Sequence, residues 1–151
     1  MTKLFVDSDG CPVREESIKV ASRNSVETFL VCAGGIRPYE NPLVQIIFVK
    51  EGLDSADDWI VENIEANDIA VTLDIPLAGR CIAKGALVVK PNGDILSDKN
   101  IGPVLASRNL SMSLRESGME LGGPPPFSKS DRSNFSSTLE NLMRKLLNSA
   151  I

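Results

Sequence analysis

Residues 3–12 read KLFVDSDGCP, and this short stretch decides how the chain folds. The apolar run at residues 4–6 is typical of a buried strand, and it ends at two acids, Asp7 and Asp9. Pro12 follows at a position suited to the first turn of a helix. The stretch therefore predicts a strand, then a turn that carries negative charge, and then a helix.

The same alternation of a short apolar run and a helical pattern recurs along the chain. Buried strands are predicted at residues 3–6, 27–33, 45–50, 69–73 and 86–90, which are rich in Val, Ile, Leu and Phe. Helices are predicted at residues 13–24, 55–66 and 76–84 and, after a turn at 91–94, at 101–119. A loop at 122–130 then precedes a helical stripe of apolar residues, namely Phe135, Leu139, Leu142, Met143 and Leu146. This order predicts one α/β domain over residues 1–151, with three layers, a mainly parallel sheet and C-terminal helices packed on it.

Composition excludes several classes of protein. The chain has 151 residues, of which 42% are hydrophobic, so it is long enough for one domain with a core of its own. It has no histidine, which excludes every mechanism that needs a histidine base or ligand. A formal net charge of −4 argues against a broad electrostatic grip on nucleic acid but leaves room for a local basic patch.

The cysteines and the N-terminus indicate where the protein works. Cys11, Cys32 and Cys81 lie far apart and form no CxxC pair, so the sequence indicates neither a disulfide framework nor a thiolate zinc site. The N-terminus lacks the long apolar region of a signal peptide, and no stretch approaches the length of a membrane span. We expect a cytoplasmic protein with no membrane partner.

Three acids are expected at one edge of the sheet. Asp7 and Asp74 each end a predicted strand, and ligands of open α/β sheets bind beyond the carboxyl ends of the strands. On the helix at 55–66, Asp57 falls on the apolar face, whereas Asp58 and Trp59 point away from it. Each acid alone is explained better by a turn or a helix end than by a site. Together they would repel one another unless a cation such as Mg²⁺ or Mn²⁺ lay between them, so the set predicts a metal site.

Five motifs carry a resemblance that covers nearly the whole chain. They are VDSDGCP at 6–12, GLDSAD at 52–57, TLDIPLA at 72–78, GGP at 122–124, and SDR at 130–132 followed by Phe135. In this order and spacing they resemble the YaiI/YqxD family, a group of uncharacterised bacterial proteins with a PIN-domain-like fold. PIN-like domains include metal-dependent ribonucleases whose acids gather at the carboxyl ends of parallel strands. The resemblance implies that Asp7, Asp57 and Asp74 are such acids, and it assigns Asp9 to the DxDxCP motif of the family.

The leading hypothesis is therefore metal-dependent cleavage of a phosphodiester, with RNA as the substrate. Asp7, Asp57 and Asp74 would bind Mg²⁺ or Mn²⁺, and Asp9 would position a water or complete the ligand shell. Thr72 is a candidate substrate contact through its hydroxyl. Three arginines are candidates for phosphate contact because a guanidinium binds phosphate as a two-pronged donor: Arg108, Arg115 and Arg132.

Two alternatives stay open from the sequence. The first is a phosphatase of the haloacid-dehalogenase type, in which Asp7 is the nucleophile and Asp9 the general acid, although Cys11 and Pro12 fit that class poorly. The second is a PIN-like protein that binds nucleic acid or regulates without catalysis. The missing histidine, the negative charge and the few aromatic residues for base stacking keep this second alternative open beside the nuclease.

Overall fold

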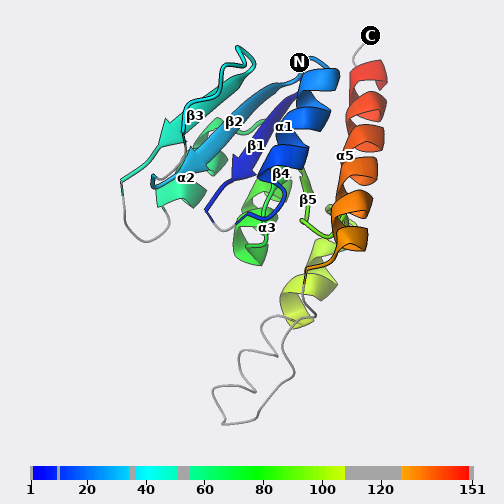
Figure 1. Ribbon diagram of the computed structural model, residues 1–151. Coiled ribbons are helices and arrows are strands. Elements are labelled where there is room, and N and C mark those ends of the chain that lie inside the picture. Colours follow the sequence, from blue (N-terminus) through cyan, green and yellow to red (C-terminus); the bar gives the residue numbers. More distant parts are fainter. Residues whose placement is uncertain (1, 10, 35–36, 51–54, 108–126, 150–151) are drawn as a thin grey trace.

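The centre of the fold is a six-stranded sheet (Figure 1). The structure, a computed structural model, describes residues 2–9, 11–34, 37–50, 55–107 and 127–149. The strands lie in the order β3-β2-β1-β4-β5-β6, and every neighbouring pair is parallel except β5 and β6. Their bounds are β1 Lys3–Asp7, β2 Glu27–Cys32, β3 Val44–Phe48, β4 Ile69–Val71, β5 Leu87–Val89 and β6 Ile95–Leu96. The predicted mainly parallel sheet is confirmed.

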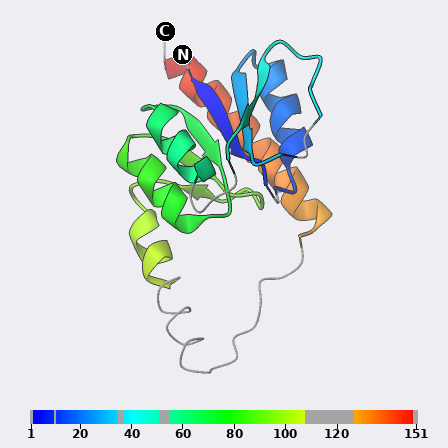
Figure 2. The same cartoon turned by 90° about the vertical axis from the view of Figure 1, so that its left-hand side faces the viewer.

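Helices cover both faces of this sheet, which gives the predicted three layers. Their bounds are α1 Arg14–Arg23, α2 Ser55–Asn63, α3 Ile75–Ala83 and α5 Lys129–Ser149, and residues 101–107 are also helical. One core cluster packs α1 and α5 against the sheet, and a second packs α2 and α3 against the other face. Figure 2 shows α2 and α3 across the sheet from α1. This arrangement is a single α/β domain consistent with a PIN-like fold.

Strand β1 shows how the sequence builds a core on both faces. Leu4 and Val6 are 0% exposed and belong to the cluster with α1 and α5, whereas Phe5 belongs to the cluster with α2 and α3. Successive side chains of a strand point to opposite faces, so a continuous apolar run satisfies both layers at once. The run ends at Asp7, which is only partly buried, where the strand leaves the core.

The apolar stripe near the C-terminus packs as predicted. Its members up to Met143 are buried in the cluster shared with α1, and Leu146 is partly buried against it. Phe135, which is 0% exposed, is the largest of them. Helix α5 therefore belongs to the core and lies directly beside α1.

Two expectations about side-chain burial were wrong. Strand β3 is an edge strand rather than a buried one, and Phe48 at its end is 61% exposed. Trp59 does not point away from the sheet: its ring centroid lies 6.0 Å from those of both Phe5 and Phe29. The indole is large enough to reach these rings from the flank of α2, which hydrophobic periodicity alone does not capture.

The region after β5 also differs in part from expectation. The turn at residues 90–94 closes a hairpin, so residues 95–96 form the antiparallel strand β6 before the next helix. Gly93 has φ +97° in this turn, and a Cβ there would lie 2.9 Å from the backbone of Asn134 in α5. The predicted helix at 101–119 is present over 101–107, and its remainder lies outside the described residues. Within the described ranges, no helix is both long enough and apolar enough to cross a membrane.

Candidate functional site

The candidate site lies where β1 and β4 end side by side. Strand β1 continues through α1 to β2 on one side, and β4 continues through α3 to β5 on the other. Open α/β sheets bind ligands at such a point, because the connections diverge and leave a crevice beyond the carboxyl ends of the strands. The register pairs Val6 of β1 with Val71 of β4. The residues that come next along the two chain segments are Asp7 and Thr72, and Asp74 lies two residues after Thr72. The predicted adjacency of the two strands is confirmed, but Asp74 lies three residues beyond β4 and lines neither of the two cavities described below.

A chain of hydrogen bonds connects these residues. The Thr72 hydroxyl, which is buried, donates to Asp7 Oδ2 at 2.9 Å. Thr72 Oγ1 in turn accepts from the backbone N–H of Asp74 at 3.0 Å. Asp74 is the N-cap of α3, since its Oδ1 accepts from Leu77 N–H at 3.0 Å. The chain fixes the Asp7 carboxylate relative to the first turn of α3.

Asp7 is in an unfavourable electrostatic position for a charged group. Burial raises the pKa of Asp7, the hydrogen bond from Thr72 opposes this rise, and the charges of Asp74 and Asp9 add to it. The negative charges of Asp74 and Asp9 thus repel the carboxylate of Asp7 at one end of the sheet. A carboxyl group whose pKa is shifted by burial and by like charges is a candidate for a functional role.

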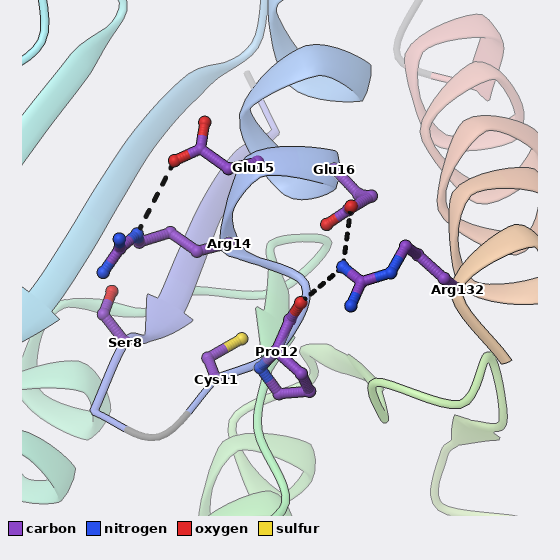
Figure 3. Close-up of a pocket in the computed structure, with 7 residues that line it drawn as sticks. All are labelled: Ser8, Cys11, Pro12, Arg14, Glu15, Glu16 and Arg132. Carbon is purple, nitrogen blue, oxygen red and sulfur yellow. Dashed lines mark hydrogen bonds and ion pairs between the residues drawn. The ribbon is translucent and has the colours of Figure 1, made fainter. Parts of the chain in front are cut away.

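Two cavities meet at this place. The smaller, of about 30 Å³, is lined by Asp7, Asp9, Cys11, Thr72, Leu73 and Pro91. It has room for an ion or for one or two waters but not for a nucleotide. The larger, of about 260 Å³, is lined by Ser8, Cys11, Pro12, Arg14, Glu15, Glu16 and Arg132 (Figure 3). Because Cys11 lines both cavities, they adjoin.

The other predicted acids lie in different surroundings. Asp9 lines the smaller cavity, and its Oδ2 accepts from Ala33 N–H at 3.0 Å. Asp57 is partly buried on α2 and does not line that cavity. Burial raises the pKa of the Cys81 thiol to about 11, and the negative charges of Asp57 and Asp7 add to this rise. Asp58 is exposed, as expected, and pairs with an arginine of α3.

The predicted ligand set is not assembled as a ready-made metal centre. Across the described ranges, no group of three or more histidine, cysteine, aspartate or glutamate side chains is placed so that it could hold a metal ion. The grouping of Asp57 with Asp7 therefore stays a prediction, while Asp9 and Asp74 are the acids that act on Asp7.

Of the three arginines predicted to contact phosphate, the structure describes Arg132. Arg108 and Arg115 lie outside the described residues. Arg132 lines the larger cavity rather than the Asp7 pocket, and its Nη1 donates to Pro12 O at 2.7 Å and to Glu16 Oε1 at 2.8 Å. Arg132 thereby ties α5 to the start of α1.

Some lining residues were not predicted from the sequence, among them Ser8, Leu73 and Arg14. For Arg14 a usable signal was its place two residues after Pro12, in the first turn of a predicted helix.

The fold and the site define the class: a three-layer α/β protein, consistent with the PIN-like type, with acids at the carboxyl ends of its central strands. The chain belongs to the YaiI/YqxD family, since the family model described as "Uncharacterized BCR, YaiI/YqxD family" matches residues 5–145. The predicted resemblance is confirmed.

Relatives in several bacteria cover almost the whole chain. A UPF0178 protein of Cereibacter sphaeroides is 53% identical over 146 residues, which are 96% of this chain and 90% of that protein. A UPF0178 protein of Agrobacterium fabrum is 46% identical over 144 residues, 95% of this chain and 94% of its own length. A third, of Rhodopseudomonas palustris, is 45% identical over 146 residues, 97% of this chain and 92% of its own length. No solved structure matches the chain. These names describe no activity, so the function must be inferred from the site.

The cap made by Asp74 gives a first prediction. Asp74→Ala should destabilise the protein by about 1 kcal/mol, which lowers its melting temperature by roughly 2–4 °C, because the Leu77 N–H loses its partner. Asp74→Asn should melt near the wild type, since asparagine caps helices as well as aspartate does. Thermal melts in chelator measure both variants. Equal destabilisation by Ala and Asn would contradict the capping role.

Proposed function

We propose that this protein is a metal-dependent phosphodiester hydrolase that acts on RNA. The observation that carries the proposal is the Asp7 carboxylate, which is partly buried, held by Thr72 and opposed by the charges of Asp74 and Asp9. A divalent cation beside Asp7 would relieve this repulsion, and a site that gains so much from a cation is suited to chemistry on phosphate.

The groups around Asp7 suit Mg²⁺ or Mn²⁺. The carboxylates of Asp7 and Asp9 and the hydroxyl of Thr72 supply the oxygens of the smaller cavity, and hard divalent ions prefer oxygen. Mg²⁺ usually keeps several waters and binds proteins through only one or two carboxylates together with substrate phosphates. A pocket lined by the carboxylates of Asp7 and Asp9 therefore fits this ion. Asp7 would be the main ligand, with Asp9 as the second.

Each residue has a defined task in this proposal. When bound, the ion lowers the pKa of a water and neutralises charge on the phosphate oxygens. Thr72 holds one oxygen of Asp7 in place, and the Asp74 backbone holds Thr72. Leu73, which is 60% exposed although apolar, offers a surface at the mouth of the cavity against which a sugar or base can pack.

The proposal is tested with a 5′-labelled single-stranded oligoribonucleotide. Purified protein should cleave it with Mg²⁺ or Mn²⁺ and leave it intact in EDTA. Thr72→Val removes only the hydroxyl and should lower the rate roughly 10-fold to 100-fold, the usual cost of losing a group that orients a metal ligand. Thr72→Ser, which keeps the hydroxyl, is the matched control and should retain most of the rate. Absence of cleavage under all conditions, or equal rates with and without EDTA, would contradict the proposal.

The phosphatase hypothesis has one observation in its favour, since Asp7 and Asp9 line the same cavity. However, Asp9 Oδ2 is occupied by Ala33 N–H, which restrains this carboxylate as a general acid. Beryllium fluoride separates the two functions, because only the phosphatase would form an adduct on Asp7 and hydrolyse phosphomonoesters.

A further inference from the structure

The end of β1 directs two neighbouring side chains into two different cavities. Asp7 lines the smaller cavity, whereas Ser8 lines the larger one. This separation follows from the alternation of side chains along a strand. A substrate whose reacting phosphate lies at Asp7 therefore has its neighbouring part beside Ser8 and the other residues of the larger cavity.

The two acids of the larger cavity already have partners. Glu16 Oε1 accepts from Arg132 at 2.8 Å. Glu15 Oε1 accepts from the Tyr39 hydroxyl at 2.7 Å. Arg132 is likewise engaged, because it also donates to Pro12 O. These pairs hold the wall of the cavity together, although the second carboxylate oxygen of Glu16, Oε2, is buried without a hydrogen-bond partner among the described residues.

Arg14 keeps one buried donor atom without a partner. Its Nε lies 3.9 Å from Glu15 Oε1, beyond hydrogen-bond distance, and has no hydrogen-bond partner among the described residues. The rest of the side chain interacts with Tyr39: burial and Glu15 raise the pKa of Tyr39, and the hydrogen bond and charge of Arg14 oppose this rise. Figure 3 shows the guanidinium of Arg14 beside Ser8, on the other side of the cavity from Arg132. A buried donor without a partner is costly, so an acceptor brought by a ligand would stabilise it.

We propose that Arg14 binds a phosphate of the RNA strand next to the phosphate at Asp7. A guanidinium binds phosphate through two parallel hydrogen bonds, and the cavity of about 260 Å³ is large enough to admit a sugar-phosphate unit. This inference rests on the proposed function and adds to it, since it makes the substrate a strand with more than one phosphate. Arg132 is then a positioning residue that keeps Glu16 away from the incoming phosphate.

The test measures binding rather than cleavage. Fluorescence anisotropy follows a labelled single-stranded oligoribonucleotide titrated with the Asp7→Asn protein in EDTA, so that the strand stays intact. Adding Arg14→Ala should weaken binding roughly 10-fold to 100-fold, and the slope of log affinity against log salt should fall by about 0.7, as expected for one lost phosphate contact on a single strand. Arg14→Lys keeps the charge without the two-pronged geometry and should lie between.

Arg23→Ala is the matched control. Arg23 lies at the opposite end of α1, is exposed and pairs with Glu140 at 3.3 Å, so its loss should leave both affinity and slope unchanged. Melting curves of all variants establish that they are folded. Unchanged affinity in Arg14→Ala, an unchanged salt slope, or an equal loss in Arg23→Ala would overturn the inference.

The outcomes also separate this inference from the proposed function. Metal-dependent cleavage by the wild type together with Arg14-independent binding would overturn the role of Arg14 alone. Arg14-dependent binding without any cleavage would overturn the proposed hydrolase and leave a nucleic-acid-binding protein. No binding of the oligoribonucleotide at all would overturn the inference.

Discussion

Asp7→Asn is expected to lower the rate of metal-dependent RNA cleavage at least about 1000-fold, because a main ligand of the ion supplies several kcal/mol of transition-state stabilisation. The same substitution should raise the melting temperature of the metal-free protein by a few degrees. Asparagine still accepts a hydrogen bond from Thr72 but removes the charge that burial, Asp74 and Asp9 oppose. Initial rates and calorimetry in EDTA measure the two effects.

The gain in stability should depend on pH. Burial and the neighbouring charges raise the pKa of Asp7 above its ordinary value of 3.8, so the folded protein holds this proton more tightly than the unfolded chain does. The wild type therefore loses stability as pH rises from 3.8 through the folded pKa, and the loss is complete above that folded pKa. The advantage of Asp7→Asn should grow as pH rises through this range and vanish below pH 3.8.

Asp98→Asn is the matched control for charge. Asp98 is exposed and lies beyond β6, away from the candidate site, so both rate and stability should stay near the wild type. A lower melting temperature for Asp7→Asn at pH 7 would contradict the claim that Asp7 is electrostatically strained. Cleavage that survives in Asp7→Asn would contradict its role as a ligand.

Phe135→Ala is expected to have the largest effect on stability. Phe135 is 0% exposed and anchors α5 in the cluster shared with α1 and the sheet. Loss of a buried phenylalanine costs about 3–5 kcal/mol, which should lower the melting temperature by roughly 6–20 °C in a chain of this size. Denaturant unfolding and calorimetry measure the change.

The control for this prediction lies on the same helix. Ser137 is exposed on α5, so Ser137→Ala should melt within about a degree or two of the wild type. A loss below about 1 kcal/mol in Phe135→Ala would show that α5 contributes little to the core, contrary to its place in the cluster.

Much of the fold was predictable because its signals are local. The apolar run at β1 and the stripe on α5 show the periods of a strand and of a helix directly in the sequence. What failed depends on partners far along the chain. Whether a strand such as β3 lies at an edge is decided by which strands pair with it, and the burial of Trp59 is decided by Phe5 and Phe29, which lie on other elements.

The candidate site was predictable to a similar extent. Asp7 and Asp74 could be placed at strand ends from the sequence, and their adjacency followed once the strands were taken as neighbours. The hydrogen bond from Thr72 to Asp7 and the unpartnered Nε of Arg14 could not be predicted, because both depend on side-chain geometry at the angstrom scale. Asp57 shows what the helical period cannot predict. The period predicts the face of α2 on which Asp57 lies, but it does not predict the distance between Asp57 and Asp7.

Binding of Mn²⁺ followed by electron paramagnetic resonance tests the central claim most directly. The signal of free Mn²⁺ should fall as wild-type protein is added, and Asp98→Asn should behave like the wild type. Asp7→Asn should bind at least about 10-fold to 100-fold more weakly, since even groups that only support metal ligands change affinity by this much. If Asp7→Asn binds Mn²⁺ as tightly as the wild type, or if the wild type does not bind it, Asp7 is not the centre of a metal site.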